Sequence, residues 1–329
     1  MYFIENSRIK AGFEAHGAEL RNLVNKETGE EYMWCGDPAF WGRVSPVLFP
    51  VVGNYRNKTS IYEGKEYHLS QHGFARDSKF EVVSQEADKI SFRLRADEKS
   101  KEVYPFDFEL VISYEICDYD EGGVQTNAGD DGAASEPVEC LKNALRIKWT
   151  VKNLDSREMF FSIGGHPAFN LRDGETKIHF SDCEKNADCI TKDTATSGIK
   201  SEEAINSLTA GILDDGLLSD RTKQIELSEG GLLQPTVELF AEDALILEDC
   251  KYKSVGLSDA EGNDYLRVTF DAPVLGIWSP AGKNAPFVCI EPWYGRTDRV
   301  GFNMQLTERE YGNRLAPDEV FETVYTICV

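Results

Sequence analysis

An alternation of apolar and polar residues with a period of two recurs along this 329-residue chain, and it constrains the fold more than any other feature. Every even-numbered position of the segment 106–116 is apolar. Successive side chains of a β-strand point to opposite faces, so the pattern predicts a strand with one face on a core and the other in water. The same alternation recurs at 90–94, 145–151 and 266–270, and more weakly at 321–327.

Helical patterns are scarce. The segment 202–218 is a candidate for a short helix, although Gly211 and Gly216 interrupt it. No repeat of 20 to 50 residues is visible, which disfavours a propeller or a solenoid. The sequence therefore predicts an all-β fold, in which residues 1–329 form a single domain, a large antiparallel β-sandwich with two sheets packed face to face.

One segment interrupts this strand pattern. Residues 118–139 are rich in Gly, Asp, Ala and Ser and lie between two predicted strands. A segment of such low apolar content cannot contribute to a packed core. We expect a flexible insertion at 118–139, within a long hairpin rather than between domains.

Composition limits the partners of the chain. The net charge of −22 disfavours nucleic acid and anionic membrane surfaces, because both would repel the chain, and it favours a neutral small molecule. The start of the chain has no secretory leader pattern and no later segment is an apolar run of 18 residues, so a soluble, cytoplasmic protein is expected. The eight cysteines include no C-x-x-C pair, which favours reduced thiols without a metal or redox role.

Two of the five histidines and one glutamate stand out chemically. His72 and His166 lie in glycine-flanked turns, and Glu291 interrupts an apolar stretch before Pro292. A positioned imidazole can donate a proton near neutral pH while a carboxylate accepts one. Each histidine alone is equally consistent with a turn residue bonded to a backbone carbonyl, but a buried carboxylate must find donors or perform chemistry. The three residues together predict an acid–base site suited to a sugar.

Taken in order, a set of short motifs resembles the galactose mutarotase (aldose 1-epimerase) superfamily. The motifs span nearly the whole chain and are Gly17-Ala18-Glu19-Leu20, the segment 46–56, His72-Gly73-Phe74-Ala75-Arg76, Tyr104-Pro105-Phe106, Gly165-His166-Pro167-Ala168-Phe169-Asn170 and Ile290-Glu291-Pro292-Trp293. Singly each motif is weak, whereas the ordered set is specific. The resemblance implies a β-sandwich of the supersandwich type and interconversion of the α and β anomers of an aldose, without a cofactor or a metal.

The resemblance also implies roles for individual residues. His166 would be the general acid on the ring oxygen and Glu291 the general base on the anomeric hydroxyl. His72 would bind and polarise the sugar near that ring oxygen. Arg56 and Asp243 match positions that bind sugar hydroxyls in the family.

The substrate remains open between a free and a phosphorylated sugar. The motif ending in Arg76 places the chain near a branch that includes hexose-6-phosphate epimerases. Arg56 and Arg76, with Arg43 nearby, could hold a phosphate, because a guanidinium matches phosphate oxygens bidentately. A salt bridge from Arg76 to Asp77 and simple exposure of Arg43 are the alternatives. Trp293 is a candidate to stack on a sugar face, and ordinary packing explains it equally well.

Three competing functions remain. A carbohydrate-binding or sensing protein could keep the same pocket without turnover, since a fold does not fix a function. Two histidines and a carboxylate could also hold a metal, but they lie on well-separated segments. Glycoside hydrolysis usually needs two carboxylates, of which only Glu291 is clearly placed. The oligomeric state is not indicated.

Overall fold

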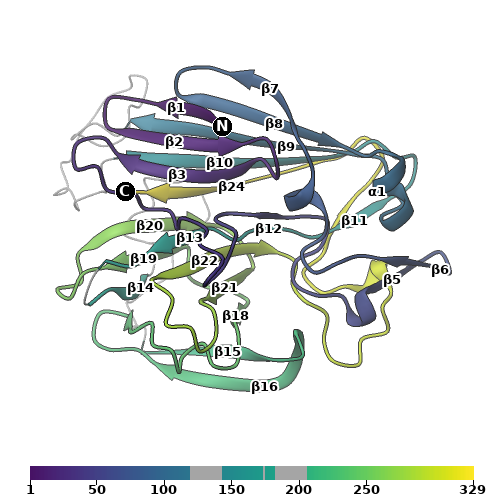
Figure 1. Cartoon of the computed structure of the whole chain (residues 1–329). Helices are drawn as coiled ribbons and strands as arrows, with labels where there is room; N and C mark the ends of the chain where they lie inside the picture. Colours follow the sequence, from purple (N-terminus) through teal and green to yellow (C-terminus); the bar gives the residue numbers. More distant parts are fainter. Residues whose placement is uncertain (119–142, 173–174, 182–205) are drawn as a thin grey trace, which may run out of the picture.

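The computed structural model describes residues 1–118, 143–172, 175–181 and 206–329. The predicted insertion at 118–139 falls, apart from its first residue, outside the described residues. Almost all regular structure is antiparallel β, as predicted, and two large sheets form the body of the molecule (Figure 1). Among the described residues, no helix combines the length and the apolar character needed for a membrane crossing.

The larger sheet has nine strands, which lie in the upper and left parts of Figure 1. In spatial order they are β17 (Leu232–Leu233), β14 (Lys177–Ser181), β19 (Ser254–Ser258), β20 (Asp264–Phe270), β24 (Val320–Cys328), β10 (Asn143–Asn153), β9 (Phe108–Asp118), β8 (Lys89–Arg95) and β7 (Glu81–Gln85).

The second sheet has eight strands and carries the residues of interest. Its order is β16 (Leu217–Glu226), β15 (Ser207–Asp214), β18 (Leu245–Glu248), β21 (Val274–Trp278), β22 (Phe287–Tyr294), β12 (Ile163–Gly165) and β4 (Val47–Leu48), while β13 (Ala168–Asn170) also pairs with β22. The two sheets pack face to face, since Trp149 and Tyr325 of the first share one core with Ile163 and Ile290 of the second.

The remaining elements are short. The first three strands, β1 (Tyr2–Glu5), β2 (Ile9–Glu14) and β3 (Glu19–Asn25), form a sheet of their own, which packs through Phe13 against Phe92 and Tyr114 on the core-facing side of the nine-stranded sheet. Two pairs are β5 (Thr59–Tyr62) with β6 (Lys65–His68), and β11 (Met159–Phe161) with β23 (Asn313–Leu315). The helical segments are α1 (Glu98–Val103) and the 3-10 turns η1 (Arg56–Lys58), η2 (Ala75–Asp77) and η5 (Leu306–Glu308).

The strands predicted from alternation are confirmed as β8, β9, β10, β20 and β24. The helix considered at 202–218 is wrong where the structure describes it, because Ser207–Asp214 and Leu217–Glu226 form a β-hairpin. Leu208 and Ala210 are buried while their neighbours Ser207 and Thr209 are exposed, which is the burial pattern of a strand. Gly216, at φ +75°, lies in the tight turn between the two strands.

The orientation of β22 places the candidate site. Its even-numbered residues, such as Val288 and Ile290, enter the core between the two sheets. Its odd-numbered residues therefore point to the opposite face of the eight-stranded sheet. There Cys289 and Trp293 join two smaller apolar clusters on either side of Glu291. Glu291 thus lies on the outward face of this sheet, away from the main core.

Candidate acid–base site

His166 and Glu291 meet because of strand register. Gly164 pairs with Trp293 and Ala168 pairs with Cys289 in the same antiparallel register. The same register places His166 opposite Glu291. Directly opposed residues project to the same face of a sheet. Nε2 of His166 lies 3.4 Å from Oε2 of Glu291. Two residues separated by 125 positions in the chain therefore form one buried pair.

Glu291 is buried without hydrogen-bond partners. Its side chain is 1% exposed, and neither Oε1 nor Oε2 accepts a hydrogen bond within the described structure. Burial raises the pKa of the Glu291 carboxyl well above its usual value, and the negative charge of Asp243 adds to the rise. The Trp293 indole N–H approaches the carboxylate and lowers this pKa, although it completes no hydrogen bond. A carboxyl without partners in such a setting is a group poised to react or to bind.

His166 is enclosed by aromatic rings. The Trp41 ring stacks on the imidazole with centroids 4.7 Å apart, and Trp278 meets it edge-on at 5.3 Å. Burial lowers the pKa of His166 to about 3, and the positive charges of Arg76 and Arg43 contribute. The imidazole is therefore neutral near pH 7 when the site holds no ligand.

His72 completes the cluster from a separate turn. Its ring meets the His166 ring edge-on at 5.7 Å. The backbone N–H of Gly53 donates to Nδ1 of His72 at 3.1 Å, so the neutral ring carries its proton on Nε2. Burial lowers the pKa of His72 well below its usual value, with the neighbouring His166 adding to the shift. His72 can thus offer an Nε2–H donor to a ligand oxygen.

Tight backbone packing holds this turn in place. A Cβ at Gly73 would lie 2.2 Å from the carbonyl oxygen of Phe49, and Gly73 has φ +70°. Only glycine fits such a position. The glycine after His72 therefore lets two backbone segments pack closely enough to aim the imidazole at His166.

Arg43 and Arg76 lie close enough to both histidines to lower their pKa values. Arg43 donates to Asp77 at 2.8 Å and Arg76 donates to the carbonyl of Gln71 at 2.7 Å. The Arg76–Asp77 pair considered from the sequence is present but long: Nε of Arg76 lies 3.7 Å from Oδ2 of Asp77, and this buried nitrogen donates no hydrogen bond within the described structure. Burial lowers the pKa of Arg76 to about 10, and the charge of Arg43 contributes. Positive charge thus borders one side of the cluster.

The other residues singled out from the sequence occupy different positions. Asp243 lies at the exposed rim, where its Oδ1 accepts from the Trp278 indole at 2.8 Å. Trp293 is 4% exposed and packs under the sheet surface against Gly164 and Gly276, the two positions where a Cβ would collide with its ring. The hydrogen bonds of Arg56 run to the loop after β22, namely to Asp298 and Phe302, and not to the cluster.

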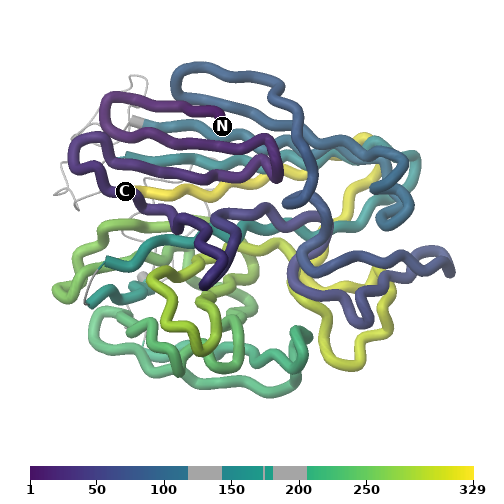
Figure 2. The backbone as a smooth tube through the Cα atoms, in the orientation of Figure 1, coloured from purple at the N-terminus to yellow at the C-terminus, as the bar shows by residue number. Residues whose placement is uncertain are grey.

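Two residues of the cluster were missed by sequence reasoning. Trp41 lies in the segment 35–45, which crosses the connection between β21 and β22 (Figure 2). Nothing in the local sequence relates it to His166, so no signal could have found it. Cys289 lies two positions before Glu291, and in a strand this spacing places both side chains on one face. That spacing was the available signal.

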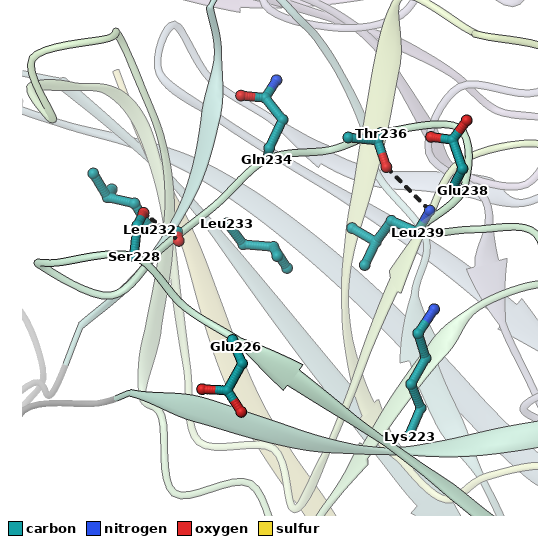
Figure 3. A pocket seen from close by; sticks show the side chains of 9 residues that line it. All are labelled: Lys223, Glu226, Ser228, Leu232, Leu233, Gln234, Thr236, Glu238 and Leu239. Atoms are coloured by element: carbon teal, nitrogen blue, oxygen red, sulfur yellow. Dashed lines mark hydrogen bonds between the residues drawn. The ribbon is translucent and has the colours of Figure 1, made fainter.

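A cavity of about 390 Å³ lies elsewhere, between β16 and the segment around β17 (Figure 3). Its lining includes Lys223, Glu226, Leu233 and Glu238. It contains no histidine, and none of the residues predicted to act chemically lines it. Size alone does not indicate chemistry, so the buried groups around His166 and Glu291 define the better candidate site.

The cluster supports acid–base chemistry on a small polar ligand. It holds one carboxyl and two imidazoles, with an aromatic wall on one side and two guanidiniums on another. Because the pKa of Glu291 is raised well above its usual value while that of His166 is lowered to about 3, a proton held by the pair in the free protein lies on the carboxyl. One acid and one base 3.4 Å apart are what a paired proton transfer requires.

Comparison with known proteins supports the predicted superfamily. The family model described as Aldose 1-epimerase matches residues 1–139. Protein LacX, plasmid, of Lactococcus lactis subsp. lactis is 27% identical, over 99% of this chain and 98% of that protein. The X-ray structure of a galactose mutarotase related enzyme from Lactobacillus acidophilus is 31% identical, with a TM-score of 0.78, over 99% of this chain and 96% of that one. A galactose mutarotase-like protein from Lactobacillus casei ATCC 334 has the same TM-score at 27% identity, over 99% of both chains.

Proposed function

Because this chain belongs to the galactose mutarotase (aldose 1-epimerase) superfamily, we propose that it interconverts the α and β anomers of an aldohexose. Opening the hemiacetal removes the O1 proton and protonates the ring oxygen. Rotation of the aldehyde and reclosure on the other face reverse both transfers. The reaction needs one acid and one base, and each typically contributes on the order of 10²–10⁴-fold.

The observation that carries the proposal is the buried His166–Glu291 pair. His166 acts as the acid on the ring oxygen and Glu291 as the base on the anomeric hydroxyl. This assignment uses the charged form of the pair, whereas burial favours the neutral form in the free protein. Sugar hydroxyls that donate to the vacant oxygens of Glu291 lower its pKa and return the proton to the imidazole. His72 donates its Nε2–H to the sugar and holds the ring oxygen in place.

A second candidate substrate is an aldose phosphate. It is favoured by the positive charges of Arg43 and Arg76 beside the two histidines, and by the buried Nε of Arg76, which has no hydrogen-bond partner within the described structure. A phosphate accepts hydrogen bonds from guanidinium groups bidentately. The acid–base chemistry is the same for both substrates, so only the group at the far end of the sugar distinguishes them.

The test is a substrate panel with the wild-type protein. Freshly dissolved α-glucose and α-galactose are followed by optical rotation, and free and phosphorylated hexoses by NMR exchange between anomers. Acceleration above the buffer rate with any hexose supports the proposal, and the preferred sugar decides between free and phosphorylated substrates. Saturable sugar binding without acceleration across the panel identifies a binding or sensing protein instead.

A further inference from the structure

Cys289 lies within the acid–base cluster but has no part in the proposed reaction. It precedes Glu291 by two residues on β22, and its side chain is fully buried. One candidate ligand atom from each of His166, Cys289 and Glu291 lies within 4.8 Å of the others. A ring nitrogen, a sulfur and a carboxylate oxygen therefore converge on one small volume.

The carboxylate oxygens of this trio are available to a ligand. Both oxygens of Glu291 lack hydrogen-bond partners within the described structure although the residue is only 1% exposed, and Nε2 of His166 faces one of them at 3.4 Å. An unsatisfied buried polar group destabilises the folded protein, so a bound ligand that engages these atoms removes that penalty. The unpartnered carboxylate oxygens are an observation independent of the spacing of the three residues.

We infer that His166, Cys289 and Glu291 form a binding site for a thiophilic divalent cation of the Zn²⁺ type. Imidazole nitrogen, thiolate sulfur and one carboxylate oxygen are donors that Zn²⁺ accepts, and three protein ligands leave a fourth position open. Mg²⁺ and Ca²⁺ require more oxygen ligands than this cluster supplies. The site has the donor set for a soft or borderline cation and not for a hard one.

Charge balance favours the same cation. A dication, a thiolate, a carboxylate and a neutral imidazole sum to zero, and a neutral cluster avoids the cost of isolated buried charge. Binding releases the thiol proton, and also the carboxyl proton when Glu291 is protonated, to the solvent. The charges of Arg43 and Arg76 oppose the cation, but Arg43 is paired with Asp77. The carboxylate of Asp243, close enough to raise the Glu291 pKa, favours it.

The ligands also lie on ordered backbone. Cys289 and Glu291 belong to β22, and His166 follows β12 in the register that pairs Gly164 with Trp293. Ligands carried by neighbouring strands keep their spacing better than ligands on loops. The cation would occupy the same groups that handle protons in the proposed reaction, so it would compete with the sugar. This competition rests on the proposed function, whereas cation binding itself does not.

The test measures metal binding directly and does not depend on enzymatic turnover. Co²⁺ is titrated into the full chain as a coloured substitute for Zn²⁺, and Zn²⁺ is then used to displace it. We expect one equivalent to bind with a thiolate-to-cobalt charge-transfer band. The change Cys289→Ser removes the band and weakens Zn²⁺ binding at least tenfold. The change Cys35→Ser, at an exposed cysteine outside the cluster, is the matched control and leaves both unchanged.

Other results overturn the site. A cobalt complex without the thiolate band, or equal Zn²⁺ affinity in wild type and Cys289→Ser, assigns the metal to other residues. The absence of stoichiometric binding also rejects it. Cys289→Ala is tested in parallel, with thermal unfolding of both variants, so that a misfolded serine variant does not decide the outcome. Zn²⁺ binding as expected in a protein without anomer exchange would reject the proposed function and retain the site.

Discussion

Replacing Glu291 by methionine should stabilise the protein while abolishing its chemistry. Glu291 is 1% exposed and neither of its carboxylate oxygens has a partner, so the folded state carries an uncompensated buried polar group. Such a group costs about 1–3 kcal/mol, and methionine fills a similar volume without that cost. Glu291→Met is therefore expected to raise the free energy of unfolding by about 1–3 kcal/mol.

Thermal unfolding gives the magnitude to look for. An unfolding entropy of about 2.1 cal/mol/K per residue amounts to roughly 0.7 kcal/mol/K for a chain of 329 residues that unfolds cooperatively. The expected increase in Tm is then about 1–4 °C, measured by calorimetry or circular dichroism. Anomer exchange is measured on the same samples and should fall to the buffer rate.

A buried carboxylate that is well paired provides the control. Asp298 is 3% exposed and forms an ion pair with Arg309 at 2.9 Å. Asp298→Asn leaves a buried guanidinium without its charge partner and should cost about 3–5 kcal/mol. Opposite signs for the two substitutions are predicted. A Tm that falls by 2 °C or more in Glu291→Met would refute the reasoning, because it would mean that the carboxyl is satisfied in the folded protein.

Three further predictions concern pH and backbone geometry. Burial lowers the pKa of His166 to about 3, so the pair does not gain a second proton as the pH falls from about 7 to 5, and kcat/KM should not decline over that range; a decline towards pH 5 contradicts this. Gly73→Ala should cost at least about 3 kcal/mol in urea unfolding, because its Cβ would lie 2.2 Å from a backbone carbonyl oxygen, whereas Gly64→Ala, which has a similar positive φ but open space around it, should cost only about 1–2 kcal/mol. A hydrogen bond from Arg157 lowers the pKa of Asp155 to about 2. The Asp155 carboxylate therefore stabilises the protein above about pH 4, and this contribution is lost as the pH falls through about 2. Asp155→Asn should be less stable than wild type by on the order of 1 kcal/mol at about pH 7, and the urea midpoints of the two proteins should converge near about pH 2.

The strands could be predicted from the sequence because, in each of them, the alternation of apolar and polar residues follows the alternation of buried and exposed positions. Residues 145–151 alternate strictly, since one face packs in the core and the other meets water, and they became part of β10. The same rule failed at 207–214, where Gly211 and mixed polarity obscured the alternation, and only the tertiary structure shows that Leu208 and Ala210 are buried. Local pattern predicts a strand only where both faces differ clearly in polarity.

The site was predictable as a set of residue types but not as a geometry. The glycines beside His72 and His166 and the apolar flanks of Glu291 marked three unusual groups. That His166 lies opposite Glu291 depends on the pairing of β12 and β13 with β22, which no local pattern encodes. The stacking of Trp41 on the imidazole likewise depends on a long-range contact, between the segment before β4 and Trp278 at the end of β21. Long-range register, and not residue identity, brings these groups together.

Anomer exchange in two conservative variants tests the central claim most directly. His166→Asn and Glu291→Gln keep the size of each side chain while removing its ability to exchange a proton. The account predicts that each lowers kcat at least about tenfold with a smaller effect on KM, when exchange between hexose anomers is followed by NMR with the sugar that the wild type prefers. Wild-type turnover in both variants would contradict it, because the buried pair would then have no part in the chemistry.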